Sequence, residues 1–279
     1  SLFKERGGTH VVISDDKEAA AYLYNDLLHL LPDAGVYLFI DSFKRPLAFE
    51  EIDKNNVLIR TETINRLTAP ITKSSILVTY PEALFEKVVA PEVLKKSCID
   101  IRIGEDLDLD FLIEMLNTYG FEGSEFVYEP GQFSIRGGII DIFSFGNEWP
   151  YRIELFDEEV ESIRMFNPMD QLSIKNIARI SLVPNVNGLF EAENKVSIFD
   201  IFPKSTVIWR DDPDMLLDQL QIAFEQLEKA LVNIKMSQDD ELRAFHQSAA
   251  YSFPREVLEQ TLLFSQLFCA GKPLLFHSD

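Results

Sequence analysis

The sequence predicts an α/β protein in which a parallel-sheet domain is interrupted by a small α+β domain that is mostly antiparallel β. Over the first hundred residues, short β-branched runs alternate with helical patterns, as in a parallel sheet. After Gly120 the apolar period shortens from about 3.6 residues to about 2, and α/β character returns beyond Pro184. These changes predict a first α/β part at 1–105, a small α+β domain at 106–185, and a segment at 186–279 that completes the first domain.

The first part contains three predicted strands and three predicted helices in alternation. Runs of β-branched residues predict strands at 9–13, 36–40 and 76–79, and apolar spacing predicts helices at 16–31, 56–67 and 81–85. Ser14 and Asp15 are expected to cap the first helix, because a short side-chain oxygen accepts hydrogen bonds from its free N-terminal amides.

The middle part begins with a predicted helix and continues as short strands. Apolar residues recur at helical spacing from Leu107 to Leu116, and Tyr119-Gly120 ends this helix. Runs separated by Gly, Pro, Asn and Asp then predict antiparallel strands at 126–128, 132–136, 139–143, 151–156 and 160–166.

The last part predicts a strand at 206–209 followed by a long helix. Asp212 is an expected N-cap, and Pro213 fits the first helical position because its missing amide costs nothing there. One apolar stripe runs from Leu216 to Ile234, so this helix is expected to pack against a sheet or another helix.

Composition excludes several classes of function. The 279 residues include 46 acidic and 26 basic side chains, which give a net charge of −20. Such a charge repels phosphate backbones, so direct nucleic-acid binding is not expected. The sequence has no apolar run long enough to cross a bilayer and no signal peptide, which predicts a cytoplasmic protein without membrane contact. Both termini resemble interrupted elements, so we expect a piece of a longer chain.

No motif for catalysis, cofactor binding or metal binding is recognisable, and we expect no enzymatic activity from this chain. A phosphate-binding Gly-rich loop ending in Gly-Lys-Ser/Thr is missing, as is a GxSxG elbow. The four histidines lack metal-ligand spacing, and His10 and His29 are interpreted as ordinary, partly exposed residues. Acidic pairs such as those at 15–16, 211–212 and 239–240 are interpreted as helix caps.

Two neighbouring segments carry a far more specific pattern. Residues 129–143 (EPGQFSIRGGIIDIF) and 151–164 (YRIELFDEEVESIR) closely resemble a signature shared by the excision-repair protein UvrB and the transcription-repair coupling factors (Mfd). In those families the signature marks the small domain that binds UvrA. The weaker resemblance of the remaining chain implies that the parallel-sheet domain is a degenerate, helicase-like lobe that no longer hydrolyses ATP.

The coupling factors fit this chain better than UvrB does. UvrB has a Walker A loop and a Tyr-rich hairpin that clamps DNA, whereas residues 41–70 here contain no Tyr. The resemblance therefore implies a non-catalytic module that recruits UvrA and links stalled transcription to nucleotide excision repair, with the motor domains outside this sequence. Alternatives are an N-terminal fragment of UvrB, an ATP-dependent DNA-loading enzyme, or a scaffold that contacts other domains of its own full-length chain.

Three residues of the signature are the expected contacts with UvrA. Arg136 and Arg152 could present two guanidinium forks to carboxylates of a partner, with Phe156 as an apolar anchor. These positions match those implicated in UvrA binding in the coupling-factor family. The alternative places Phe156 in the core and both arginines in ion pairs within the domain. Arg164 is a weaker candidate, and Glu154 could orient the arginines.

Overall fold

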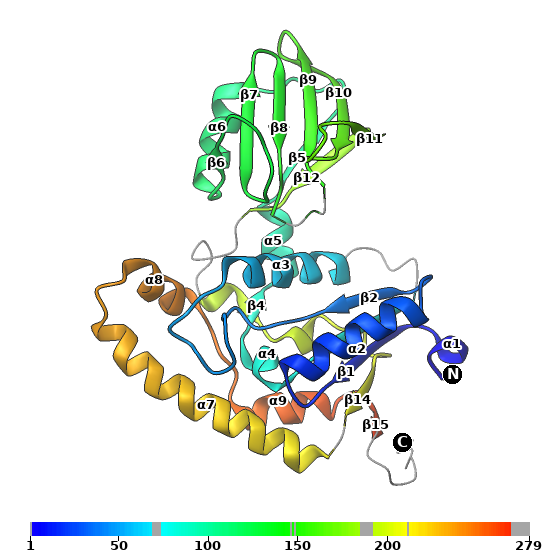
Figure 1. The fold of residues 1–279 in the computed structure, drawn as a ribbon, viewed down its shortest axis with the longest axis vertical. Coiled ribbons are helices and arrows are strands. Elements are labelled where there is room, and N and C mark those ends of the chain that lie inside the picture. Colours follow the sequence, from blue (N-terminus) through cyan, green and yellow to red (C-terminus); the bar gives the residue numbers. More distant parts are fainter. Residues whose placement is uncertain are drawn as a thin grey trace. The chain divides into compact units, whose positions relative to one another are not determined.

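The computed structural model describes residues 2–68, 74–145, 147, 149–184, 192–210 and 212–268. The chain forms two compact units, Ser1–Ala90 with Phe190–Asp279, and Pro91–Leu189 (Figure 1). The second unit begins earlier than the predicted boundary near residue 105, because β5 (Ile99–Arg102) pairs with β12 (Arg179–Leu182) inside that unit. The chain leaves the first unit once and returns to it.

The first unit contains a five-stranded parallel sheet in the order β15-β14-β1-β3-β2. Its strands are β1 (Thr9–Ile13), β2 (Gly35–Leu38), β3 (Ser75–Thr79), β14 (Val207–Arg210) and β15 (Ser265–Phe268). Because β1 lies between β3 and β14, segments from both ends of the described chain share one sheet. The parallel sheet confirms the predicted α/β class.

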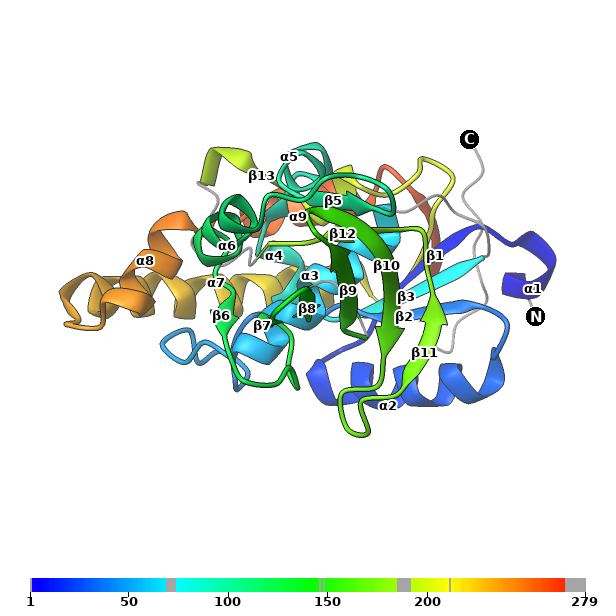
Figure 2. The same ribbon diagram turned by 90° about the horizontal axis from the view of Figure 1, so that it is seen from above.

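Helices surround this sheet, and two short strands, β4 (Val88–Val89) and β13 (Lys195–Val196), pair beside it. The helices are α1 (Leu2–Arg6), α2 (Lys17–Leu30), α3 (Lys54–Thr68), α4 (Pro81–Phe85), α7 (Pro213–Met236), α8 (Asp240–Ser248) and α9 (Pro254–Thr261). Helix α2 packs along β2 and β3, and α7 contacts α4, α8 and α9. Figure 2 shows α8 beside the far end of the long helix α7.

Aspartates start several of these helices. Asp16, not the predicted Ser14 or Asp15, caps α2 by accepting a hydrogen bond of 2.8 Å from the Ala19 amide. Asp212 and Asp239 cap α7 and α8 in the same way. The interpretation of these acidic residues as helix caps is confirmed.

His10 was expected to be partly exposed, and this prediction was wrong. The residue is fully buried in β1, where the indole Nε1 of Trp209 donates to its Nδ1 at 2.8 Å. Nε2 therefore carries the proton and donates to the Gly7 carbonyl at 3.1 Å. Burial lowers the pKa of His10, which keeps the ring neutral.

The second unit contains a six-stranded sheet in the order β11-β10-β9-β8-β7-β6. These strands are β6 (Glu122–Gly123), β7 (Gln132–Arg136), β8 (Ile139–Ile142), β9 (Tyr151–Phe156), β10 (Glu159–Phe166) and β11 (Ser173–Asn176), and the helices of the unit are α5 (Pro91–Lys96) and α6 (Leu109–Thr118). All pairs are antiparallel except β6 with β7. The four longer predicted strands are confirmed, whereas the strand predicted at 126–128 does not form.

Alternation along these strands separates an apolar core face from a polar face. Four isoleucines lie opposite one another across β7, β8, β9 and β10: Ile135, Ile140, Ile153 and Ile163. The last three are essentially inaccessible to solvent, and Leu112 and Leu116 of α6 are buried as well. The polar residues between them therefore point to the opposite side of the sheet.

Candidate functional site

The candidate site is this second side of the sheet, which we call the outer face. One row pairs Ser134, Asp141, Arg152 and Arg164 across β7, β8, β9 and β10, and the next row pairs Arg136, Ile139, Glu154 and Ser162. Phe156 follows Glu154 by two residues on β9 and so belongs to the same face. The alternation of the strands thus brings the three predicted site residues to one surface.

A buried carboxylate organises the two predicted arginines. Asp141 is only 1% exposed. Its Oδ2 accepts hydrogen bonds from Arg136 Nη2 at 2.6 Å and from Arg152 Nη2 at 2.8 Å, while its Oδ1 accepts one from Arg152 Nε at 2.7 Å. Arg152 also donates to Gln171 Oε1 at 2.9 Å. We call Arg136, Asp141, Arg152 and Gln171 the arginine cluster.

The arginines are therefore not two free forks, as one interpretation of the sequence supposed. Both pair with an internal carboxylate, and their side chains remain 37% (Arg136) and 17% (Arg152) exposed. The hydrogen bond with Asp141 raises the pKa of Arg152 further above its ordinary value. Two guanidinium groups share one carboxylate, so the arginine cluster keeps one net positive charge.

Aromatic side chains accompany this charge. Phe156 is 75% exposed, which contradicts the alternative that placed it in the core. The guanidinium of Arg136 lies over the ring of Phe126 at 5.0 Å, and Phe126 contacts Tyr128. Phe126 and Tyr128 are themselves substantially exposed. A positively charged cluster with exposed aromatic rings has the composition of a protein-binding hot spot.

Glu154 and Arg164 form a separate pair on the outer face. Arg164 donates to Glu154 Oε1, and the hydroxyl of Ser162 donates to Glu154 Oε2 at 2.7 Å. Glu154 thus pairs with Arg164, whereas the hydrogen bonds that orient Arg136 and Arg152 go to Asp141.

The two glycines after Arg136 form the turn between β7 and β8. Gly137 has a φ of 61°, which side-chain-bearing residues rarely adopt. A Cβ on Gly138 would lie 2.9 Å from the backbone oxygen of Leu155 on β9. This close approach to β9 explains the Arg-Gly-Gly sequence and fixes the backbone that carries Arg136.

Sequence reasoning missed Asp141, Gln171 and Phe126. Asp141 left a usable signal, because a single carboxylate inside the apolar run 139–143 must find a cation when that strand is buried. Gln171 left none, since its contact with Arg152 spans 19 residues of sequence. Phe126 was attributed to a strand.

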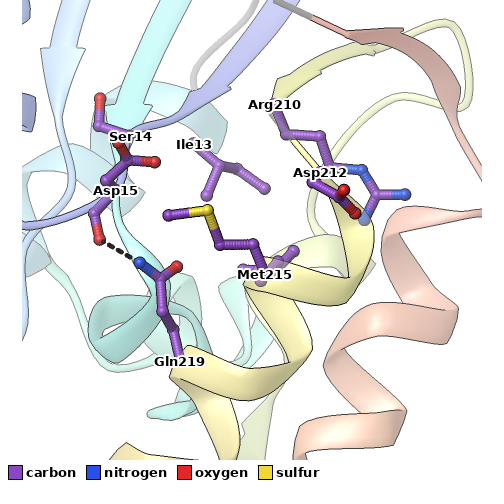
Figure 3. A pocket seen from close by; sticks show the side chains of 8 residues that line it. Ile13, Ser14, Asp15, Arg210, Asp212, Met215 and Gln219 are labelled. Atoms are coloured by element: carbon purple, nitrogen blue, oxygen red, sulfur yellow. Dashed lines mark hydrogen bonds between the residues drawn. The ribbon is translucent and has the colours of Figure 1, made fainter. Parts of the chain in front are cut away.

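The first unit has a pocket at the carboxyl ends of β1 and β14 (Figure 3). It is lined by Ile13, Ser14, Asp15, Arg210, Asp212, Met215, Leu216 and Gln219. The cavity has a volume of about 10 Å³, which is enough for about one water molecule. The lining contains two aspartates and one arginine, so its charge does not favour a phosphate group.

The described ranges offer neither a metal site nor a membrane span. No group of three or more His, Cys, Asp or Glu residues there could hold a metal ion. No helix in the same part of the chain is long and apolar enough to span a membrane.

Comparison with known proteins identifies the segment that contains the six-stranded sheet. Residues 99–187 match the UvrB interaction domain. The chain is 38% identical over 203 residues to a transcription-repair-coupling factor of Bacillus subtilis, which covers 70% of this chain and 16% of that protein. The corresponding protein of Myxococcus xanthus is 31% identical over 191 residues, or 66% of this chain and 16% of its own length.

These relatives favour a coupling factor over a fragment of UvrB. The chain spans about one sixth of their length. The chain is thus similar to the transcription-repair-coupling factors, and its residues 99–187 match the UvrB interaction domain.

Proposed function

We propose that this chain is a non-catalytic module of a bacterial coupling factor that recruits UvrA and so links stalled transcription to nucleotide excision repair. The match of residues 99–187 to the UvrB interaction domain is the observation that carries the proposal. Within this domain we propose Arg136, Arg152 and Phe156 of the outer face as the residues that contact UvrA.

The chemistry of the outer face supports a protein partner. Phe156 exposes three quarters of its surface on the same face as a cluster with one net positive charge. Burying such a ring on association removes apolar area from water, while the arginines can pair with carboxylates. The net charge of −20 argues against a nucleic-acid partner.

The remaining aspects of the function are proposals as well. Other domains of a longer chain are proposed as further partners, and the cytoplasm as the compartment. ATP-driven translocation is assigned to regions outside this sequence, because the matched relatives are about six times longer than the matched segment.

Binding of purified UvrA to immobilised chain 1–279 tests the proposal. Wild type is expected to bind, and Phe156→Ala is expected to weaken binding at least about tenfold, because truncation of an aromatic anchor typically costs more than about 1.4 kcal/mol. The melting temperature should stay unchanged, since Phe156 packs little within the chain.

Phe111→Ala is the matched control, because Phe111 is a 59% exposed phenylalanine of the same unit, on α6. It should bind UvrA like wild type. Absence of UvrA binding by wild type, or equal losses for the two phenylalanine variants, would contradict the proposal.

A further inference from the structure

We infer that Asp141 and Gln171 are positioning residues that hold Arg136 and Arg152 for one carboxylate of the protein partner. The inference rests on the proposed function. It adds that the partner supplies a carboxylate, and that Asp141 and Gln171 act on this carboxylate only through the two arginines. It also gives a reason why a buried carboxylate stands in the middle of the outer face.

The geometry of Asp141 fixes both guanidinium groups at once. Its two oxygens accept three hydrogen bonds of 2.6 to 2.8 Å from the arginines. Charge-assisted, bidentate contacts of this kind restrict both the position and the plane of a guanidinium. Phe166 lies under Arg152, with its ring centre 4.5 Å from the guanidinium carbon, and supports the same orientation.

Gln171 completes the arrangement from outside the strands. Its Oε1 accepts from Arg152 Nη2 at 2.9 Å, and its own Nε2 donates to the Pro168 carbonyl at 2.8 Å. The second bond fixes the amide, so the oxygen points at the arginine. Arg152 is thus held by the carboxylate of Asp141 and the amide of Gln171.

Donors remain after these contacts are made. A guanidinium has five N–H groups. Within the described part of the chain, Arg152 Nη1 and Arg136 Nε make no hydrogen bond to protein, and Arg136 Nη1 donates once, to the Glu125 carbonyl at 3.0 Å. These free N–H groups are available to a ligand without loss of the contacts with Asp141.

Charge and surroundings define the group that these donors would bind. The arginine cluster has one net positive charge, which a single carboxylate neutralises. Phe126 contacts Arg136, Ile139 is the strand partner of Arg136, and Phe156 lies on the same face of the sheet. All three are exposed, so the carboxylate belongs to a surface that also offers apolar side chains, as on a protein. An Asp or Glu of the partner, next to a hollow for Phe156, fits this description.

A double-mutant cycle with UvrA, measured by calorimetry on chain 1–279, tests the inference. Asp141→Asn should weaken binding at least about tenfold in the wild-type background, because the forks lose their orientation. The same change should have little further effect in the double variant Arg136→Ala/Arg152→Ala, in which both guanidinium groups that Asp141 holds are already absent. It should keep its full effect in Phe156→Ala, since the anchor acts independently.

Asp141→Asn leaves the largely buried Arg152 without its carboxylate, so thermal unfolding must show that this variant still folds. Gln171→Met provides a second variant that does not remove a charge. Methionine keeps the length of the side chain and removes the acceptor. We expect about three- to tenfold weaker binding in wild type and none of this loss in Arg152→Ala.

The outcomes separate this inference from the proposed function. The positioning role is overturned, while the proposed function stands, if wild type binds UvrA and Gln171→Met binds equally well. It is also overturned if the loss from Gln171→Met persists in Arg152→Ala, or if the loss from Asp141→Asn persists in Arg136→Ala/Arg152→Ala. If wild type does not bind UvrA, the proposed function fails, and the inference fails with it.

Discussion

Two buried charged residues, Asp141 and Arg210, differ in how many hydrogen bonds they make. Asp141 is 1% exposed and accepts three hydrogen bonds from arginines. Arg210 is 2% exposed but makes only one hydrogen bond, from Nη1 to Thr261 at 3.0 Å, and its Nε and Nη2 have no partner among the described residues. Burial accordingly lowers the pKa of Arg210. Asp141 thus holds two arginines of the outer face in place, whereas the buried, unpartnered donors of Arg210 destabilise the first unit.

Replacement of Arg210 should therefore stabilise the first unit. Arg210→Met keeps an unbranched side chain and removes the unpaired donors, so the free energy of unfolding is expected to rise by about 1–3 kcal/mol. Urea unfolding followed by circular dichroism measures the change. A loss of stability would show that the attraction between Arg210 and Asp212 outweighs the cost of burying the unpartnered donors.

At the scale of elements, local pattern predicted most of the fold. Strands with one buried face, such as β7, β8, β9 and β10, were predictable because apolar and polar residues alternate in them. The strand at 126–128 failed because the amides of Tyr128 and Glu129 donate to the side chain of Gln132 instead of to a neighbouring strand. Strand β11 was missed because all its residues are exposed.

The turn between β7 and β8 should be sensitive to a single methyl group. Gly138→Ala places a Cβ 2.9 Å from the Leu155 oxygen, so we expect a loss of about 1–3 kcal/mol in stability and weaker UvrA binding, because Arg136 moves with the turn. Chemical denaturation and a binding titration measure the two effects.

Gly123→Ala is the control for this turn. Gly123 is also in the six-stranded sheet, but a Cβ there would make an ordinary contact of 3.6 Å with Phe133. If both alanine variants lose the same stability, the close approach of Gly138 to β9 is not the cause.

For the whole molecule, sequence showed the α/β class and the location of the signature, while long-range contacts stayed hidden. The partnership of His10 with Trp209 joins residues 199 positions apart, and that of Arg152 with Gln171 depends on a loop. No local pattern encodes either contact. The sequence therefore placed Arg136, Arg152 and Phe156 on one face of the sheet, but it did not identify the residues that hydrogen-bond to the two arginines.

Two buried histidines make the stability of the first unit depend on pH. Burial lowers the pKa of His10 and of His246, whose ring accepts from the Tyr251 hydroxyl and donates to the Phe49 carbonyl. The unfolded chain takes up protons near the ordinary value of 6.5, whereas the folded chain resists them. Their contribution is complete above this pH and is lost as the pH falls below it.

Urea unfolding between pH 7.5 and 5.5 measures this dependence. The free energy of unfolding should decrease toward acid, and His246→Gln should flatten the decrease. His29→Gln, at an exposed position, should behave like wild type. An equally steep decrease in His246→Gln would exclude that histidine as a cause.

Photo-cross-linking tests most directly whether the partner contacts the outer face. Benzoylphenylalanine in place of Phe156, and separately in place of Phe111 on α6, is irradiated in the presence of UvrA. We expect a covalent adduct with UvrA from position 156 and none from position 111. An adduct from position 111 alone, or none from either position under conditions where the chain binds UvrA, would contradict this expectation.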